Sequence, residues 1–123
     1  MTELASTMTP CEVASQAAHA ISVLNELTHG GGELTTADDV RAIVGSLELI
    51  GLSLPQLCEQ LARILVVQRE DRHVETGPGQ DPDFWVAEAV EALAAAGQAA
   101  DMLAAALAQA GKTSAELRPR SAG

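Results

Sequence analysis

The sequence predicts an all-α protein, an antiparallel bundle of three to four helices. Two apolar repeats with helical spacing predict this class: one between residues 40 and 65 with steps of three and four, and an alanine-rich one between residues 86 and 110. At 123 residues, the chain has room for one domain. The first repeat consists of Val40, Ile43, Val44, Leu47, Ile50, Leu54, Leu57, Cys58, Leu61, Ile64 and Leu65.

The expected organisation has three parts. Residues 1–10 form a flexible N-terminal lead, residues 11–111 form the helical bundle, and residues 112–123 form a flexible C-terminal tail. The first helix is expected from Cys11 to Thr28. His29 and the three glycines that follow it should end this helix, because glycine loses too much backbone entropy to remain helical.

The central segment begins with a clear helix start but contains an ambiguity near Gly51–Pro55. Thr36 is a good N-cap, and acidic residues follow it in the first turn. In one interpretation a kinked helix continues to about Val74; in the other, Ser53 caps a new helix with Pro55 in its first turn. The apolar repeat keeps its phase across the proline, which favours the kinked helix.

The last helix has clear boundaries. A glycine- and proline-rich loop covers residues 75–80, Asp81 is the expected N-cap, Pro82 the first helical residue and Gly111 the end. Alanine fills many seam positions of this helix, so we expect a neighbouring helix to approach it closely. The expected large core residues of the domain are Leu47, Leu54, Leu61, Leu93 and Leu103.

Composition and charge restrict the function classes. The formal net charge of −10 argues against nucleic-acid binding and against binding to anionic membranes. No uncharged apolar run reaches the roughly 18 residues of a membrane span, and no signal segment is recognised, so a cytoplasmic location is expected. Only 2% of the residues are aromatic, so the core is thin and we expect a homodimer.

Two Glu-x-x-His pairs are the only pattern with metal-site chemistry. Glu26 precedes His29, and Glu70 precedes His73, with the spacing found in carboxylate-bridged metal sites of four-helix bundles. A helix break at Pro55 would place both pairs at the same end of a bundle. Glu70 and His73 fall at heptad positions that face solvent, whereas metal ligands must point inward. We therefore expect no metal and no cofactor, and keep a metal-binding bundle as the alternative.

A few apolar residues occupy positions that should be polar on a solvated helix face. These residues, Leu52, Val66 and Val67, suggest a partner contact, and Trp85 is a further candidate because tryptophan is enriched in interface hot spots. No arrangement of nucleophile, base or phosphate-binding loop is present, so no enzyme is expected.

The chain also resembles small uncharacterised all-helical proteins of actinobacteria. The resemblance lies in the segment Leu34-Thr35-Thr36-Ala37-Asp38-Asp39-Val40, the Leu54-Pro55-Gln56-Leu57 helix and the alanine-rich last helix, over residues 33–110. Some of those proteins are carried on mobile genetic elements, and the resemblance implies no active residue. The predicted function is a non-enzymatic helical interaction or assembly module. Besides the metal-binding bundle, an acidic regulatory partner of the antitoxin or anti-regulator type is an alternative.

Overall fold

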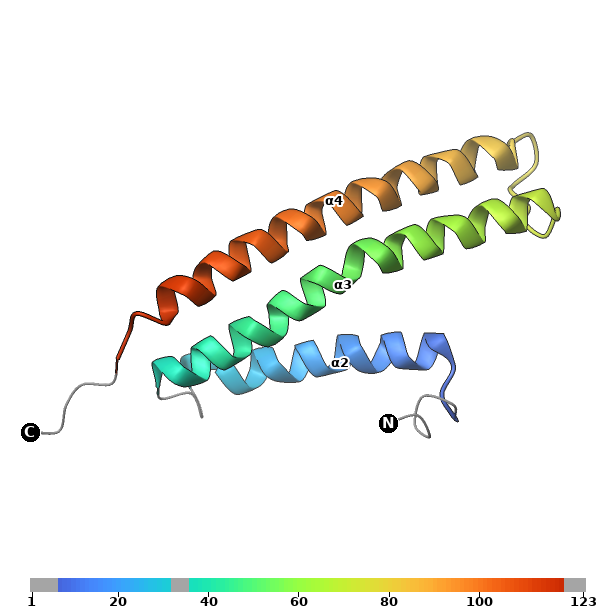
Figure 1. Ribbon diagram of the computed structural model, residues 1–123. Helices are drawn as coiled ribbons and strands as arrows, with labels where there is room; N and C mark the ends of the chain where they lie inside the picture. The colour runs from blue at the N-terminus through green and yellow to red at the C-terminus, as the bar shows by residue number, and fades with distance from the viewer. Residues whose placement is uncertain (1–6, 32–35, 119–123) are drawn as a thin grey trace, which may run out of the picture.

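A computed structural model describes residues 7–31 and 36–118, and it is all-helical. The helices are α2 (Pro10–Thr28), α3 (Ala37–Glu70) and α4 (Pro82–Ser114), with a short 3-10 helix, η1 (His29–Gly31), after α2 (Figure 1). No strand occurs among the described residues, so the all-α prediction is confirmed. The two long helices α3 and α4 form an antiparallel hairpin.

Helix α2 begins with a capping box. The side chain of Thr9 accepts a hydrogen bond from the Glu12 amide (3.1 Å), and the Glu12 carboxylate accepts one from the Thr9 amide (3.0 Å). The hydrogen bond from the Thr9 amide, followed by an interaction with the Thr9 side chain, holds the pKa of the Glu12 carboxylate below its usual value. The helix ends as expected at its glycines, where Gly30 takes a left-handed φ of 69°. Gly32 lies outside the described residues.

Helix α3 continues through Pro55, so the interpretation with a break is wrong. The Ser53 hydroxyl does not cap a new helix; it donates to the carbonyl of Leu49 at 2.9 Å, inside the helix. In Figure 1 the helix changes direction near its middle. Pro55 cannot donate to the carbonyl of Gly51, and a proline at this spacing bends a helix. Thr36 caps α3 as predicted, accepting from the Asp39 amide at 3.1 Å.

A Schellman motif ends α3 at Glu70, four residues before the predicted limit. The amide of His73 donates to the carbonyl of Gln68 (2.8 Å), and the amide of Arg72 donates to the carbonyl of Arg69 (3.0 Å). The motif requires a left-handed residue after the cap, and Arg72 has a φ of 59°. A residue other than glycine is strained in this conformation.

Replacing Arg72 with glycine should therefore stabilise the protein by about 0.5–1 kcal/mol, because the left-handed conformation has no Cβ penalty in glycine. Urea unfolding followed by far-UV circular dichroism measures the change. The same replacement at Arg63, inside α3, should lower stability by about 1 kcal/mol. Equal losses at both positions would contradict the assigned role of Arg72.

Helix α4 starts as predicted and ends later than predicted. Asp81 accepts from the Asp83 amide at 3.0 Å, and Pro82 is the first helical residue. The helix passes through Gly111, so the prediction that this glycine ends it is wrong. A helical glycine costs only about 1 kcal/mol. The next turn forms instead, and the Thr113 hydroxyl donates to the carbonyl of Gln109 at 3.1 Å.

The seam between α3 and α4 is built from small residues. A Cβ on Gly51 would lie 3.3 Å from the Cβ and 3.4 Å from the Cα of Ala104, so the two helices nearly touch there. This confirms the predicted close approach. Among the residues whose burial the structure describes, the buried ones are Gly51, Val86, Gly97, Ala100 and Ala104. Of the expected core residues, Leu61 and Leu103 are exposed, and Leu47, Leu54 and Leu93 are half-buried.

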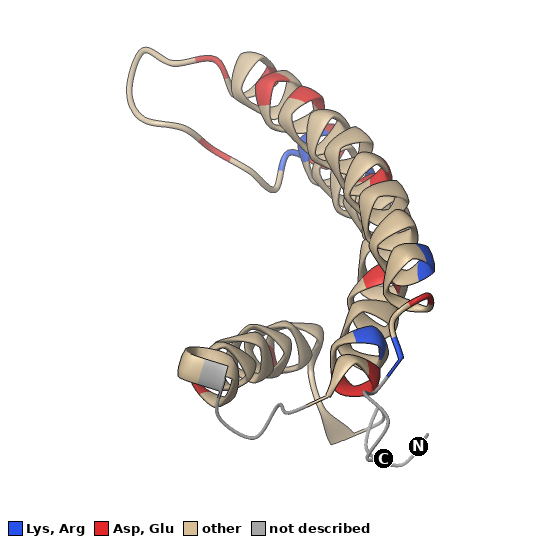
Figure 2. Cartoon of the chain, turned by 90° about the vertical axis from the view of Figure 1, so that its left-hand side faces the viewer, with Lys and Arg blue, Asp and Glu red and all other residues tan. Residues whose placement is uncertain are grey.

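Helix α2 lies beside the first part of α3 without packing tightly on it (Figures 1 and 2). Among the described residues, no Cα atom of α2 is within 8 Å of a Cα atom of α3 or α4, and α2 has no buried residue. A hollow of about 330 Å³ lies between the two helices. Its main apolar lining is Ile21 and Leu24 of α2 and Ile43, Leu47 and Ile50 of α3.

Candidate interaction surface

One side of the α3–α4 hairpin carries the charged side chains of the central part of α3 together with Asp101 of α4. A groove on this side is lined by Glu59 of α3 and by Gln98 and Asp101 of α4. Glu48 and Arg63 lie on the same side of α3 as Glu59, at spacings of 11 and four residues. We call this side the charged face, defined by Glu48, Glu59, Arg63, Gln98 and Asp101.

The opposite side has no charged residue in the same part of the hairpin. Leu65 of α3 lines a hollow of about 190 Å³ together with Trp85 and Ala89 of α4. Other apolar residues follow from these three at helical spacing along both helices. We call this side the uncharged face, defined by Leu54, Leu57, Leu61, Ile64, Leu65, Trp85, Ala89, Ala92, Ala96 and Leu103.

The large side chains of the uncharged face remain accessible to solvent. The exposed fraction is 47% for Leu57, 43% for Leu61 and 55% for Ile64 on α3, and 47% for Trp85 and 49% for Leu103 on α4. These are substantial apolar areas for a chain that has few buried residues. Contiguous exposed apolar surface of this kind typically marks a contact site.

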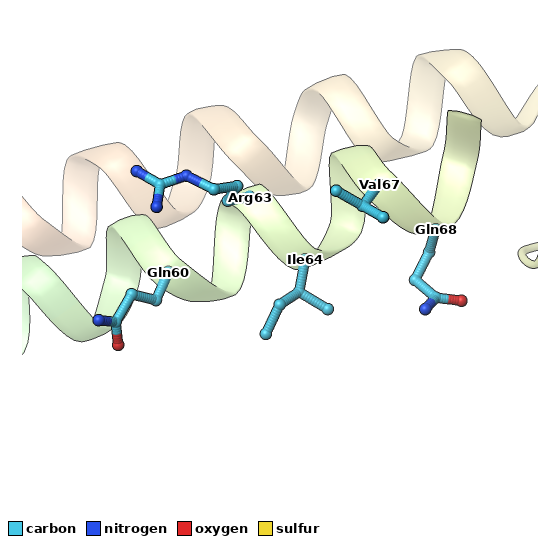
Figure 3. Close-up of a pocket in the computed structure, with 5 residues that line it drawn as sticks. All are labelled: Gln60, Arg63, Ile64, Val67 and Gln68. Carbon is cyan, nitrogen blue, oxygen red and sulfur yellow. The ribbon is translucent and has the colours of Figure 1, made fainter. Parts of the chain in front are cut away.

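The edge of the uncharged face lies on α3 near its C-terminal end. Figure 3 shows Gln60, Ile64 and Gln68 pointing away from α4. Together with Arg63 and Val67 they line an open hollow of about 500 Å³. All five residues come from one helix, so this hollow is a shallow surface feature and not an enclosed site.

The four predicted partner residues do not form one strip. Leu52 is 56% exposed and lies on the charged face, four residues after Glu48. Val66 is half-buried, and Val67 lines the open hollow with Ile64. Trp85 lies on the uncharged face, where its ring meets Phe84 edge to face at 5.1 Å. Their role in partner binding stays a prediction.

Sequence reasoning missed the residues that make up most of the uncharged face. Leu61 was expected in the core, and Leu57 belongs to the same apolar repeat. The repeat is wider than the stripe that one neighbouring helix covers, since α4 contacts the side of α3 that carries Gly51 and Cys58. The width of the repeat was the signal that could have identified them.

The structure separates the two Glu-x-x-His pairs. Glu26 and His29 lie at the end of α2, beside the start of α3, whereas Glu70 and His73 lie at the opposite end of α3 (Figure 1). At 1.5 Å per residue, the 34 residues of α3 span about 50 Å. The expectation that both pairs share one end is wrong because α3 does not break at Pro55. No cluster of three metal-ligating side chains occurs among the described residues.

Both long helices are apolar enough to cross a membrane by length and composition. The most apolar 18-residue windows of α3 and α4 each have a mean hydropathy of 1.3. Such windows contain no more than two charged residues, whereas the sequence expectation considered only uncharged runs. Only 6% of the α3 window and 17% of the α4 window are buried, so both helices hold much accessible apolar surface.

The arrangement can hold another apolar surface but has no built chemical site. The hollows are open, and no polar or charged side chain among the described residues is buried. No protein-family model, curated protein or solved structure matches the chain.

Proposed function

We propose that the protein is a non-enzymatic helical interaction module that works as a homodimer in the cytoplasm. In this proposal two chains complete an antiparallel helical bundle that one chain only begins. The observation that carries the proposal is the small core, whose only buried hydrophobic residues among those described are Val86, Ala100 and Ala104. Burial of apolar surface is the main favourable term in folding, so a chain with so little of it gains much from association.

The accessible surface area supports association. A compact monomer of this mass exposes about 6,200 Å², whereas the chain exposes 9499 Å². The surplus of about 3,300 Å² is several times the ~800 Å² that each partner buries in an interface of standard size.

The exposure of the polar groups supports a non-enzymatic role. Catalytic groups are usually placed in a water-excluding site where burial and neighbouring charges tune their pKa values. The acidic and histidine side chains that the structure describes all retain contact with solvent. The open hollows also have no wall on one side, so they would hold a small substrate poorly.

Size-exclusion chromatography with light scattering tests the proposal over a wide concentration range. We expect a stable mass of twice the 12.7 kDa of one chain. A mass that stays at that of one chain up to high concentration would refute self-association.

A second candidate is an acidic regulatory partner that covers a basic surface of another protein. The net charge of −10 and the carboxylates of the charged face favour it. Such a complex should weaken steeply between low and high salt, because exposed ion pairs are screened. A captured complex that is insensitive to salt would count against this candidate.

A further inference from the structure

We propose that the uncharged face is the docking surface for a second copy of this chain. The inference rests on the proposed self-association and adds the surface through which it occurs. The surface comprises the exposed leucines and Ile64 of α3 and the Trp85–Leu103 side of α4, as defined above.

The distribution of charge selects this face for a contact between two copies. Two copies bring together formal charges of −10 each, so contact through acidic surfaces would be repulsive. From Ala42 to Gln68, the only charged residues of α3 are Glu48, Glu59 and Arg63, and all three lie on the charged face. The uncharged face is therefore the side on which two identical acidic chains can meet without opposing like charges.

The shape of the uncharged face fits a self-complementary contact. Helix α3 contributes large side chains such as Leu57 and Leu61, whereas α4 contributes mainly alanines such as Ala92 and Ala96. In a two-fold contact, the large side chains of α3 in each copy can pack against the small side chains of α4 in the other copy.

The apolar strip of α3 faces α2 across a hollow in its first part and faces no described helix of the same chain farther along. Helix α2 lies beside Ile43, Leu47 and Ile50, the first third of the strip, across the hollow of about 330 Å³. Beyond it, Leu57, Leu61 and Ile64 continue the strip without a covering helix from the same chain. The second copy supplies that cover, and the surplus surface area is large enough for a stable interface.

A bilayer fits the same surface less well. Glu48, Glu59 and Asp101 lie within the middle parts of the two helices, and a carboxylate at the centre of a bilayer is unfavourable. A helix pair lying flat on a membrane usually carries basic residues on its polar side, whereas this chain is strongly acidic.

Two matched substitutions test the face. Leu61→Glu places a carboxylate on the uncharged face, and Leu52→Glu places one at a similarly exposed leucine of the same helix on the charged face. We expect Leu61→Glu to raise the dimer dissociation constant by at least about 100-fold, because each interface would bury unpaired charges. Leu52→Glu should leave the dimer intact. Sedimentation velocity gives the mass, and far-UV circular dichroism confirms that each variant is helical.

A second variant and a second readout make the test independent of folding defects in α3. Ala96→Glu places the charge on α4, at an exposed residue of the uncharged face, and should also give monomers. Trp85 is the only tryptophan, so its fluorescence reports on this face. Its emission should shift to longer wavelength, and acrylamide should quench it more strongly, in the two monomeric variants and on dilution of the wild type.

The possible failures are distinguishable. A wild-type dimer that persists in Leu61→Glu and Ala96→Glu would overturn the assigned face and leave self-association standing. A wild type that is monomeric at every concentration would overturn both the assigned face and the proposed self-association. Flotation of the monomeric wild type with phosphatidylcholine vesicles would show that a membrane occupies the face instead.

Discussion

Replacing Gly51 with leucine should destabilise the protein by about 3 kcal/mol, because overpacking at a tight contact forces the surrounding structure apart. A Cβ at this position would lie 3.4 Å from the Cα and from the backbone nitrogen of Ala104, and backbone atoms cannot rotate away. The longer leucine side chain would push α3 and α4 apart along the seam that holds the hairpin. Urea unfolding at one fixed protein concentration measures the loss, since dimerisation couples stability to concentration.

Gly45 provides the matched control for this prediction. It lies six residues earlier in α3, and a Cβ there would have nothing within 4 Å. Gly45→Leu should stabilise the protein by about 0.5–1 kcal/mol, because leucine is the better helix former. Similar unfolding midpoints for the two variants would show that α3 and α4 do not approach closely at Gly51.

Replacing Pro55 with alanine should stabilise the protein by about 2 kcal/mol. A proline inside a helix costs roughly 3 kcal/mol, and the alanine amide can donate to the carbonyl of Gly51. The contact with Gly97 involves the Cα and Cβ atoms of Pro55, at 3.5 and 3.9 Å from the position of an added Cβ, and alanine retains both atoms. The larger freedom of the unfolded chain without proline offsets about 0.4–1 kcal/mol of the gain.

The neighbouring residue serves as the control for Pro55. Gln56 is exposed in the same turn, and Gln56→Ala should change stability by no more than about 0.5 kcal/mol. The measurement is again the urea midpoint, together with the helical content from circular dichroism. A lower midpoint for Pro55→Ala would mean that the bend is needed to hold α3 against α4.

Helix starts were predictable because their signals are local. Thr36 and Asp81 accept hydrogen bonds from backbone amides two or three residues away, so the sequence around each cap is sufficient to identify it. The end of α4 was harder to predict. Gly111 weakens a helix by an amount that a few hydrogen bonds of the next turn outweigh, so a single glycine does not decide a helix end.

The surface was less predictable than the helices because burial is not local. The apolar repeat places Leu61 and Cys58 in one broad stripe, but only the path of α4 decides that Cys58 is half-buried and Leu61 exposed. The same dependence on topology applied to His29 and His73. The two histidines lie far apart because α3 is continuous. The proline at position 55 meant that the sequence alone did not decide whether α3 continues or breaks there.

The connection between α3 and α4 also determines how the hairpin can fold. Residues 71–81 join two helices that are neighbours in sequence, and the ion pair between Arg69 and Asp83 (3.9 Å) lies next to this connection. Contacts near the connection close short loops, whereas those towards the other end, such as Val44 beside Gly111, close much longer ones. The entropic cost of loop closure is therefore lowest at the end of the hairpin next to residues 71–81. The two helices can associate progressively from that end. Because each new contact follows one already formed, we expect folding to be fast and its transition state to be structured near Arg69 and Asp83.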